Sequence, residues 1–192
     1  MSRTPERSPE PVREHPAVAK VAAALTAAGL TASVEGIRFL PQAARTAVQA
    51  ADALGIGVGA IANSLVFRMT TADGGAEPLL VLTSGAHRAD TAILATLTGA
   101  SRVGRADPDF VRAHTGQVIG GVAPVGHPAR ITTLVDDALR AYDTVWAAAG
   151  HPNTVFPTTF DGLVALTGGR AATVSTDATD TTDSRTGRSA PR

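Results

Sequence analysis

Apolar residues recur along the chain with helical spacing in some segments and with strand spacing in others. Between residues 15 and 30, Val18, Val21 and Leu25 fall on one stripe, and Gly29 follows as a stop signal. This spacing predicts a helix over residues 15–30 that ends near the glycine. The same reasoning predicts further helices at residues 43–54, 88–97, 108–114, 136–149 and 160–167.

The extended segments are rich in β-branched and aromatic side chains. Residues 61–70 (IANSLVFRMT) and 78–83 (PLLVLT) flank the turn sequence Asp73-Gly74-Gly75, and two such segments around a turn predict a β-hairpin. Helices and strands that alternate along the chain predict an α/β or α+β fold, a single compact domain with a mixed, mostly antiparallel sheet packed by helices. The remaining strands are expected at residues 33–40, at 131–135, around Val155 and at 172–174.

The two ends of the chain carry no apolar periodicity. Residues 1–14 contain three prolines, and residues 175–192 are almost entirely Ser, Thr, Asp and Arg. Such compositions bury too little apolar surface to offset the entropy lost on ordering. We therefore expect disordered tails at 1–14 and 175–192 around one folded domain at 15–174.

Composition narrows the classes of function. The 192 residues are 44% hydrophobic but only 4% aromatic, so aliphatic side chains must fill the core. Seventeen Lys and Arg residues balance 17 Asp and Glu residues, which argues against binding along DNA but allows recognition of a nucleic acid end. The absence of cysteine excludes disulfides and thiolate chemistry. No apolar segment is long enough for a membrane span, so we expect a cytoplasmic protein.

Several motifs are better explained by structure than by chemistry. The segment 55–60 (GIGVGA) fits a loose dinucleotide pattern, but it follows a predicted helix and precedes a predicted strand, the reverse of that site. The five histidines have no metal-binding spacing, and no G-x-S-x-G elbow surrounds a serine. Asp136 and Asp137 are adjacent on a predicted helix and so point apart. The sequence predicts neither a metal site nor a cofactor.

The segment 120–126 (GGVAPVG) is the most informative for chemistry. Two glycines let the backbone approach a ligand closely, and the proline stiffens the turn. Backbone N–H groups of such a loop can point at a carbonyl oxygen where negative charge develops. An ordinary tight turn between two elements would have the same composition, so the residues alone leave both interpretations open.

The order of four segments points to a family. The sequences IANSLVF (61–67), VLTSGAHRAD (81–90), ADPDFVRAHTG (106–116) and GGVAPVG occur in this order at plausible spacing. Together they resemble the YbaK/prolyl-tRNA-synthetase-associated domain family, and VDDALRAYDTVWAAAG and FDGLVALTGG resemble its last third. The resemblance covers roughly residues 17–174. No single motif is specific, but their conjunction is.

The resemblance implies a deacylase that hydrolyses the ester of mischarged aminoacyl-tRNA, removing a small amino acid such as alanine or cysteine. It implies chemistry without metal or cofactor, in which the free 2′-hydroxyl of the terminal adenosine and a water take part while the glycine loop holds the ester carbonyl. The partners implied are the acceptor end of aminoacyl-tRNA and an aminoacyl-tRNA synthetase. The implied catalytic residues are Gly120, Gly121 and Asn63, and the implied substrate-binding residues are Ser64, Ser84, His87, Thr115, Pro124, His127 and Gly150.

The chain departs from the family pattern at two positions. Asn63 stands where typical members carry lysine, and Ala148 stands where some members carry serine. An asparagine amide can donate and accept hydrogen bonds but brings no charge for a phosphate. Two hypotheses follow: a freestanding deacylase that acts in trans, or a non-catalytic module that binds an amino-acid-like or nucleotide-like ligand. The intact loop favours the first, and the lost lysine favours the second.

Overall fold

The computed structural model describes residues 15–176 and places eight strands in one mixed sheet. The sheet order is β1-β7-β6-β2-β3-β5-β8, and β4 also pairs with β2, farther along that strand than β6. The strands are β1 (Arg38–Phe39), β2 (Ile61–Thr70), β3 (Ala76–Ser84), β4 (Arg102–Arg105), β5 (Thr132–Asp136), β6 (Val145–Ala148), β7 (Thr154–Thr158) and β8 (Arg170–Ala172). The α+β fold with a mixed, mostly antiparallel sheet is confirmed.

Six α-helices and two short 3₁₀ segments connect the strands in the described part of the chain. Among these residues no helix is long and apolar enough to cross a membrane. The α-helices are α1 (Pro16–Ala27), α2 (Thr31–Glu35), α3 (Ala47–Leu54), α4 (Thr91–Thr98), α5 (Pro108–Thr115) and α6 (Phe160–Thr167), and the 3₁₀ segments are η2 (Val58–Ala60) and η3 (Asp137–Ala141).

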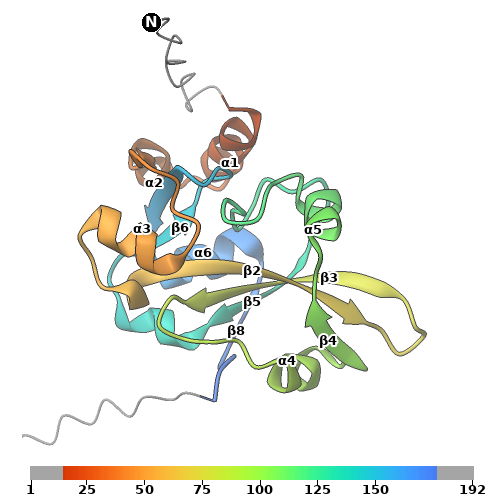
Figure 1. Ribbon diagram of the computed structural model, residues 1–192. Coiled ribbons are helices and arrows are strands. Elements are labelled where there is room, and N and C mark those ends of the chain that lie inside the picture. The colour runs from red at the N-terminus through yellow and green to blue at the C-terminus, as the bar shows by residue number, and fades with distance from the viewer. Residues whose placement is uncertain (1–14, 177–192) are drawn as a thin grey trace, which may run out of the picture.

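The long β2–β3 hairpin crosses the middle of the molecule (Figure 1). Both faces of β3 are covered, because Leu79 and Val81 point into one apolar cluster while Leu80 and Leu82 point into another. All four side chains have no exposed surface, as expected for a strand between two packed layers. A third cluster holds α3 against Trp146 of β6 and Ile61 of β2.

The hairpin and most helices lie where the pattern predicts them. The strand expected at 172–174 instead ends at Ala172, as β8, and β4 was not predicted. Two further segments were assigned the wrong type of element. Residues 33–40 were expected to be a strand; they form most of α2, and only Arg38 and Phe39 pair, with β7. Residues 136–149 were expected to be a helix, but the chain makes only η3 and then extends into β6. In that extended part Val145, Ala147 and Ala149 alternate into the core. Pairing with β2 and β7 overrides the local helical tendency there.

The folded part continues slightly past the boundary expected from composition. The Val174 side chain is fully buried and its carbonyl accepts the Asp90 N–H at 2.9 Å, while Ser175 is only 4% exposed. Ser175 was assigned to the C-terminal tail and belongs to the packed domain instead. Residues 1–14 and 177–192, which include the rest of both expected tails, lie outside the described residues.

Two truncations test this boundary. We expect a chain of residues 15–176 to unfold with the same free energy as the full chain. A chain of residues 15–173 should lose about 2 kcal/mol, because it lacks the buried Val174 side chain and its carbonyl. Thermal and urea unfolding measure both. A loss of similar size in the 15–176 chain would mean that a terminal segment packs on the domain.

Candidate active site

A cavity opens where β2 and β6 separate. The parallel pairing of these strands includes only Ile61 with Trp146 and Ala62 with Ala147. On the same side of β2, pairing with β4 begins only at Phe67. The cavity, about 250 Å³ in volume, lies beside this opening in the sheet. Its position is therefore set by where two strand pairings stop.

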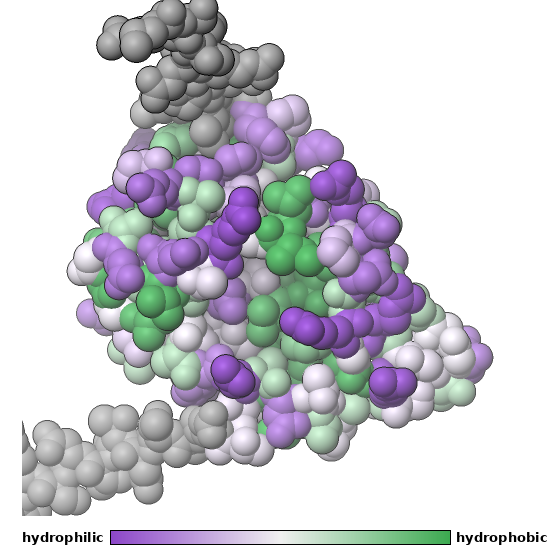
Figure 2. Space-filling view, in the orientation of Figure 1, coloured by the Kyte–Doolittle hydropathy of each residue, from purple (hydrophilic) through white to green (hydrophobic). Residues whose placement is uncertain are grey.

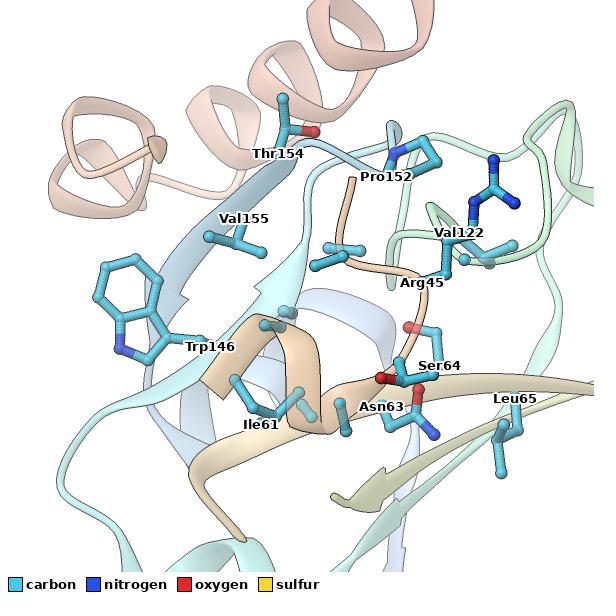
Figure 3. A pocket seen from close by; sticks show the side chains of 18 of the residues that line it. Arg45, Ile61, Asn63, Ser64, Leu65, Val122, Trp146, Pro152, Thr154 and Val155 are labelled. Carbon is cyan, nitrogen blue, oxygen red and sulfur yellow. The ribbon is translucent and has the colours of Figure 1, made fainter. Parts of the chain in front are cut away.

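Five segments of the chain form the cavity walls. Figure 3 shows Asn63 and Ser64 on β2 below the cavity, Arg45 and Val122 on one side, and Val155 and Trp146 on the other. The lining residues are Ala44, Arg45, Thr46, Ala47, Ala50, Ile61, Ala62, Asn63, Ser64, Leu65, Ile119, Gly120, Val122, Trp146, Ala147, Ala148, Pro152, Thr154 and Val155.

The lining is mostly small and apolar, and three of its polar side chains, those of Ser64, Asn63 and Arg45, have no protein partner in the described chain, whereas the Thr46 and Thr154 hydroxyls do. The Ser64 Oγ is buried without any hydrogen-bond partner. No hydrogen bond within the described residues engages the Asn63 side-chain amide, although the Asn63 backbone carbonyl accepts one from the Thr83 hydroxyl. Arg45 is the one ionisable side chain among the lining residues. A buried hydroxyl normally finds a partner, so the Ser64 Oγ is available to a ligand, as are the unpartnered side chains of Asn63 and Arg45 beside it.

Arg45 is held at the cavity by hydrogen bonds around its backbone. Thr46 caps α3 by accepting the Gln49 N–H at 3.2 Å, and the Gln49 Oε1 accepts the Arg45 N–H at 2.9 Å. The Ala44 N–H donates to the Pro152 carbonyl at 2.8 Å. The Arg45 guanidinium is exposed and has no carboxylate partner among the described residues. Its charge is therefore free for an anionic ligand.

The two loop glycines are needed by the backbone itself. Residues 118–121 form a turn in which the Gly121 N–H donates to the Val118 carbonyl at 3.0 Å and Gly120 has a φ of +89°. That conformation is typical of the third residue of a type II turn. A Cβ on Gly121 would lie 2.7 Å from the Pro152 nitrogen. Alanine at either position would therefore disturb the fold as well as any chemistry.

The loop also limits which N–H groups can bind substrate. The Gly121 N–H is used in the turn, and the Ala123 N–H donates to the Gln117 Oε1 at 2.7 Å. The N–H groups of Gly120 and Val122 have no acceptor within residues 15–176, and both residues line the cavity. Gly120 and Val122, rather than Gly121, are thus the available backbone donors.

A buried polar chain fixes the loop. The Thr115 hydroxyl donates to the Val111 carbonyl at 2.7 Å and accepts the Gln117 N–H at 3.0 Å. The Gln117 side chain, only 3% exposed, also donates to the Val125 carbonyl at 3.2 Å. His127 contacts the Ala123 carbonyl through Nε2 at 2.9 Å. Thr115 and His127 therefore position the loop rather than line the cavity.

A second cavity continues from the first along β2. It has a volume of about 710 Å³ and shares Ser64, Leu65, Ile119, Gly120 and Val122 with the first. Its other lining residues come from β2, β4 and the start of α5, and most are apolar. Figure 2 shows apolar surface around a hollow in the middle of this face, with hydrophilic residues on both flanks. The two cavities form one groove that is continuous past Ser64 and Gly120.

Other residues implied by the resemblance lie elsewhere. The Ser84 N–H and His87 Nδ1 both contact the buried Asp136 carboxylate, at 3.0 and 3.1 Å, and the Ser84 hydroxyl donates to the Gly59 carbonyl. Gly150 has a φ of +94° and packs on the backbone of α1. Pro124, with His127, lines a separate hollow. Of the implied residues, the structure brings Asn63, Ser64 and Gly120 together at the cavity.

Sequence reasoning missed three residues of this region. Arg45 carries the site's charge, Gln117 orders the glycine loop, and Pro152 supports both Gly121 and Ala44. The Thr46-x-x-Gln49 spacing is a helix-start signal that could have placed Arg45 at a fixed position. No comparable sequence signal marks Gln117. In the described part of the chain, no three His, Cys, Asp or Glu side chains gather as metal ligands.

The family is decided by comparison with known proteins. A model of the aminoacyl-tRNA editing domain matches residues 41–166. The chain belongs to the aminoacyl-tRNA editing domain family. The resemblance noted from the sequence is thereby confirmed, and the cavity between β2, β6 and the glycine loop is the candidate active site of an editing domain.

Other members of this fold are similar over most of the described residues. A candidate trans-editing enzyme for prolyl-tRNA synthetase is 38% identical, with a TM-score of 0.72 over 83% of this chain and 97% of that one. Hypothetical protein APE2540 is 28% identical, with a TM-score of 0.71 over 81% and 98% of the two chains. Uncharacterized protein YwhH of Bacillus subtilis (strain 168) is 30% identical over 114 residues, 59% of this chain and 69% of that protein.

The editing-domain loop should respond to pH through His127. Burial lowers the pKa of His127 below its usual 6.5, and the hydrogen bond to Ala123 offsets this only in part. Below pH 6.5 the unfolded chain therefore binds a proton more readily than the folded one, and stability falls as pH drops through the folded pKa. His127→Gln keeps a donor for Ala123 but does not titrate. We expect its free energy of unfolding to fall less than that of the wild type between pH 7 and pH 5.

His151 also contributes to the pH dependence of stability and does so equally in the wild type and in His127→Gln. Its pKa is also lowered, by burial and by the nearby His15, so the His127→Gln chain keeps part of the pH dependence. Equal pH slopes in wild type and His127→Gln would show that His127 does not contribute to it.

Proposed function

We propose that this editing domain hydrolyses the ester between a small amino acid and the 3′ end of a mischarged tRNA, acting in trans. The observation that carries this proposal is the lining of the cavity. It offers hydrogen-bonding groups without protein partners, small apolar walls and one free cation, but no carboxylate or imidazole among its lining residues. Such a site can bind and polarise an ester without supplying a general base of its own.

The walls favour a small aminoacyl side chain. Four alanines, Ala47, Ala50, Ala62 and Ala147, are among the residues that line the cavity of about 250 Å³. An alanyl or cysteinyl side chain buries its apolar surface there without needing a polar partner. The similarity to a candidate trans-editing enzyme for prolyl-tRNA synthetase supports proline tRNA as the carrier and that synthetase as a partner.

The backbone donors suit the reacting carbonyl. The Gly120 and Val122 N–H groups are free of protein acceptors and belong to the loop that forms one wall. Pointed at the ester carbonyl, they would stabilise the negative charge that develops when water attacks. With no acid or base in the lining, the substrate's own 2′-hydroxyl is the group that assists proton transfer. The bond broken is between the carbonyl carbon and the ribose 3′-oxygen.

Arg45 supplies the charge that Asn63 lacks. Its guanidinium is exposed beside the cavity, has no carboxylate partner in the described chain and can bind a phosphate of the acceptor end in two-donor fashion. One or two such contacts require no strongly basic protein, in agreement with a net charge of zero. Asn63 then contributes a neutral hydrogen bond to the terminal nucleotide.

A panel of mischarged tRNAs tests the proposed function. We expect the purified chain to deacylate alanyl- or cysteinyl-tRNA for proline and to leave prolyl-tRNA intact, because the small cavity selects against the larger ring. Release of radiolabelled amino acid measures this. If neither the wild type nor Asn63→Lys hydrolyses any tRNA in the panel, yet the wild type binds a small ligand, the protein is a binding module rather than an enzyme.

Substitutions at the two polar positions separate charge from hydrogen bonding. Arg45→Ala should lower kcat/KM about tenfold and weaken its salt dependence, because a charged contact to phosphate is lost. Asn63→Ala should lower it about fivefold, on the order of 1 kcal/mol, and Asn63→Lys should preserve or raise it. Arg112→Ala, an exposed arginine on α5 outside both cavities, is the matched control.

Unfolding experiments on the same variants complete that test. All four should melt close to the wild type, since the Arg45 and Asn63 side chains have no hydrogen bond within the described residues. A large fall in melting temperature for Asn63→Ala would make Asn63 a structural residue. An unchanged salt dependence in Arg45→Ala would remove Arg45 from phosphate binding.

A further inference from the structure

One stretch of the central strand has no partner on one side. β2 pairs with β3 along its whole length. On its other side it pairs with β6 at residues 61–62 and with β4 at residues 67–70. Residues 63–66 between these two ladders have no strand partner on that side. Both cavities open onto this gap, because Ser64 and Leu65 line each of them.

The hydrogen-bond pattern shows which backbone groups face the gap. The Ile61 carbonyl accepts the Gly85 N–H at 2.8 Å, which makes the odd-numbered residues of β2 those bonded to β3. In an antiparallel pair the intervening residues point their N–H and C=O groups the other way. The Thr70 carbonyl agrees, since it accepts the Ser101 N–H beyond β4. The backbone groups of Ser64 and Val66 therefore point into the gap.

Three of these groups lack a protein partner. Pairing with β6 ends at Ala62, so β6 does not bond the Ser64 N–H. Pairing with β4 begins at Phe67, so β4 does not bond the Val66 N–H. No loop or side-chain hydrogen bond reaches either residue within the described part of the chain. The Ser64 N–H, the Ser64 carbonyl and the Val66 N–H are thus free, beside the unpartnered Ser64 hydroxyl. Unpaired N–H and C=O groups at a strand edge can form hydrogen bonds with a ligand that takes the place of a neighbouring strand.

The gap is too short for a peptide. β-Strands in proteins usually run to about five or six residues, whereas here only Ser64 and Val66 present their backbone groups and β6 and β4 close both ends. A carbonyl followed two residues later by an N–H offers one acceptor and one donor side by side. A planar ring with an adjacent donor and acceptor on one edge matches that pair, and nucleobases have such edges.

We infer that the open edge of β2 binds the terminal adenine of the tRNA, with its N6 amino group donating to the Ser64 carbonyl and its N1 accepting the Val66 N–H. This assignment rests on the proposed function, which supplies an adenosine as the ester-bearing nucleotide. The ring lies in the second cavity, whose volume is about 710 Å³ and whose walls include Leu65, Phe67 and Ile119. Apolar side chains on both sides of a base are the usual setting for an unstacked nucleotide.

The continuity of the two cavities supports this placement. The residues they share include Ser64 and Gly120, at the junction. With adenine on the β2 edge, the ribose lies at this junction and its ester extends into the smaller cavity beside the Gly120 and Val122 N–H groups. On the outer wall Asp107 is paired with Arg68 at 3.1 Å, while Arg105 has no carboxylate partner among the described residues. Arg105 is therefore free for the preceding phosphate.

Two non-hydrolysable ligands test the assignment, since side-chain substitution cannot remove a backbone group. The first is 3′-alanylamino-3′-deoxyadenosine, and the second is the same molecule with N6,N6-dimethyladenine, which has no N6 donor. We expect the first to bind at least about tenfold more tightly by titration calorimetry, the scale of one lost hydrogen bond plus the clash of the methyl groups.

Amide hydrogen exchange locates the binding. In the free protein, the Ser64 and Val66 amides should exchange faster than those of Leu65 and Phe67, which are bonded to β3. The adenosine ligand should slow the Val66 amide about tenfold, and the dimethyl ligand should leave it unchanged. The slowly exchanging Leu65 and Phe67 amides are the internal control.

The outcomes separate this inference from the proposed function. Equal affinity for both ligands, or a Val66 amide unaffected by binding, would overturn adenine recognition even in a chain that deacylates tRNA. Failure of the unmethylated adenosine ligand to bind at millimolar concentration would overturn it as well. Conversely, adenosine-specific binding that protects Val66, in a chain that hydrolyses no mischarged tRNA, would support the adenine site and refute the hydrolase.

Discussion

Parallel pairing between β2 and β6 lasts for only two residues, and the whole candidate site depends on where it stops. A strand in the centre of a sheet normally has all of its backbone groups bonded on both sides. Here β6 leaves β2 after Ala62 and β4 joins it at Phe67. The interval creates a cavity in the middle of an otherwise continuous sheet, with the rigidity of a core strand as its floor.

The surroundings of that interval are fixed by polar contacts rather than by apolar packing alone. Gln117 accepts and donates hydrogen bonds across the glycine loop, Thr115 anchors Gln117, and Gly121 packs directly on Pro152. Such a network costs much to disturb, because each buried member would lose its partner. A loop held this way keeps its free N–H groups in one orientation before any ligand binds, which is the condition for electrostatic stabilisation of a reacting carbonyl.

Elements and contacts formed by residues close together in the sequence could be predicted, whereas those that depend on residues far apart could not. The β2–β3 hairpin was readable because its turn residues and β-branched strands lie within one short segment. Asp107 followed by Pro108 likewise marks the start of α5, where the carboxylate accepts the Phe110 N–H at 2.8 Å. β6 was mistaken for a helix, since Leu139, Tyr142, Trp146 and Ala149 fall at helical spacing.

The error at β6 also hid the site. The cavity exists because β6 is a strand that ends early, so an interpretation with a helix there could not locate it. Asn63, Ser64 and Gly120 were identified because they lie in motifs with family resemblance, and the structure brings them together at the cavity. Gln117 and Pro152 act through neighbours distant in sequence. No local pattern signals such contacts.

Pro152 joins three parts of the molecule in one place. Its carbonyl holds Ala44, its ring packs on Gly121, and Gly150 beside it packs on Ala17 of α1. A change there would move several walls of the cavity together. Ala47 and Ala50 reach the cavity from α3, a separately capped helix. Enlarging these two side chains would narrow the cavity while leaving the loop and the β2 edge in place, so the proposed amino-acid preference and the proposed nucleotide contact are set by separate parts of the chain and can change independently of one another.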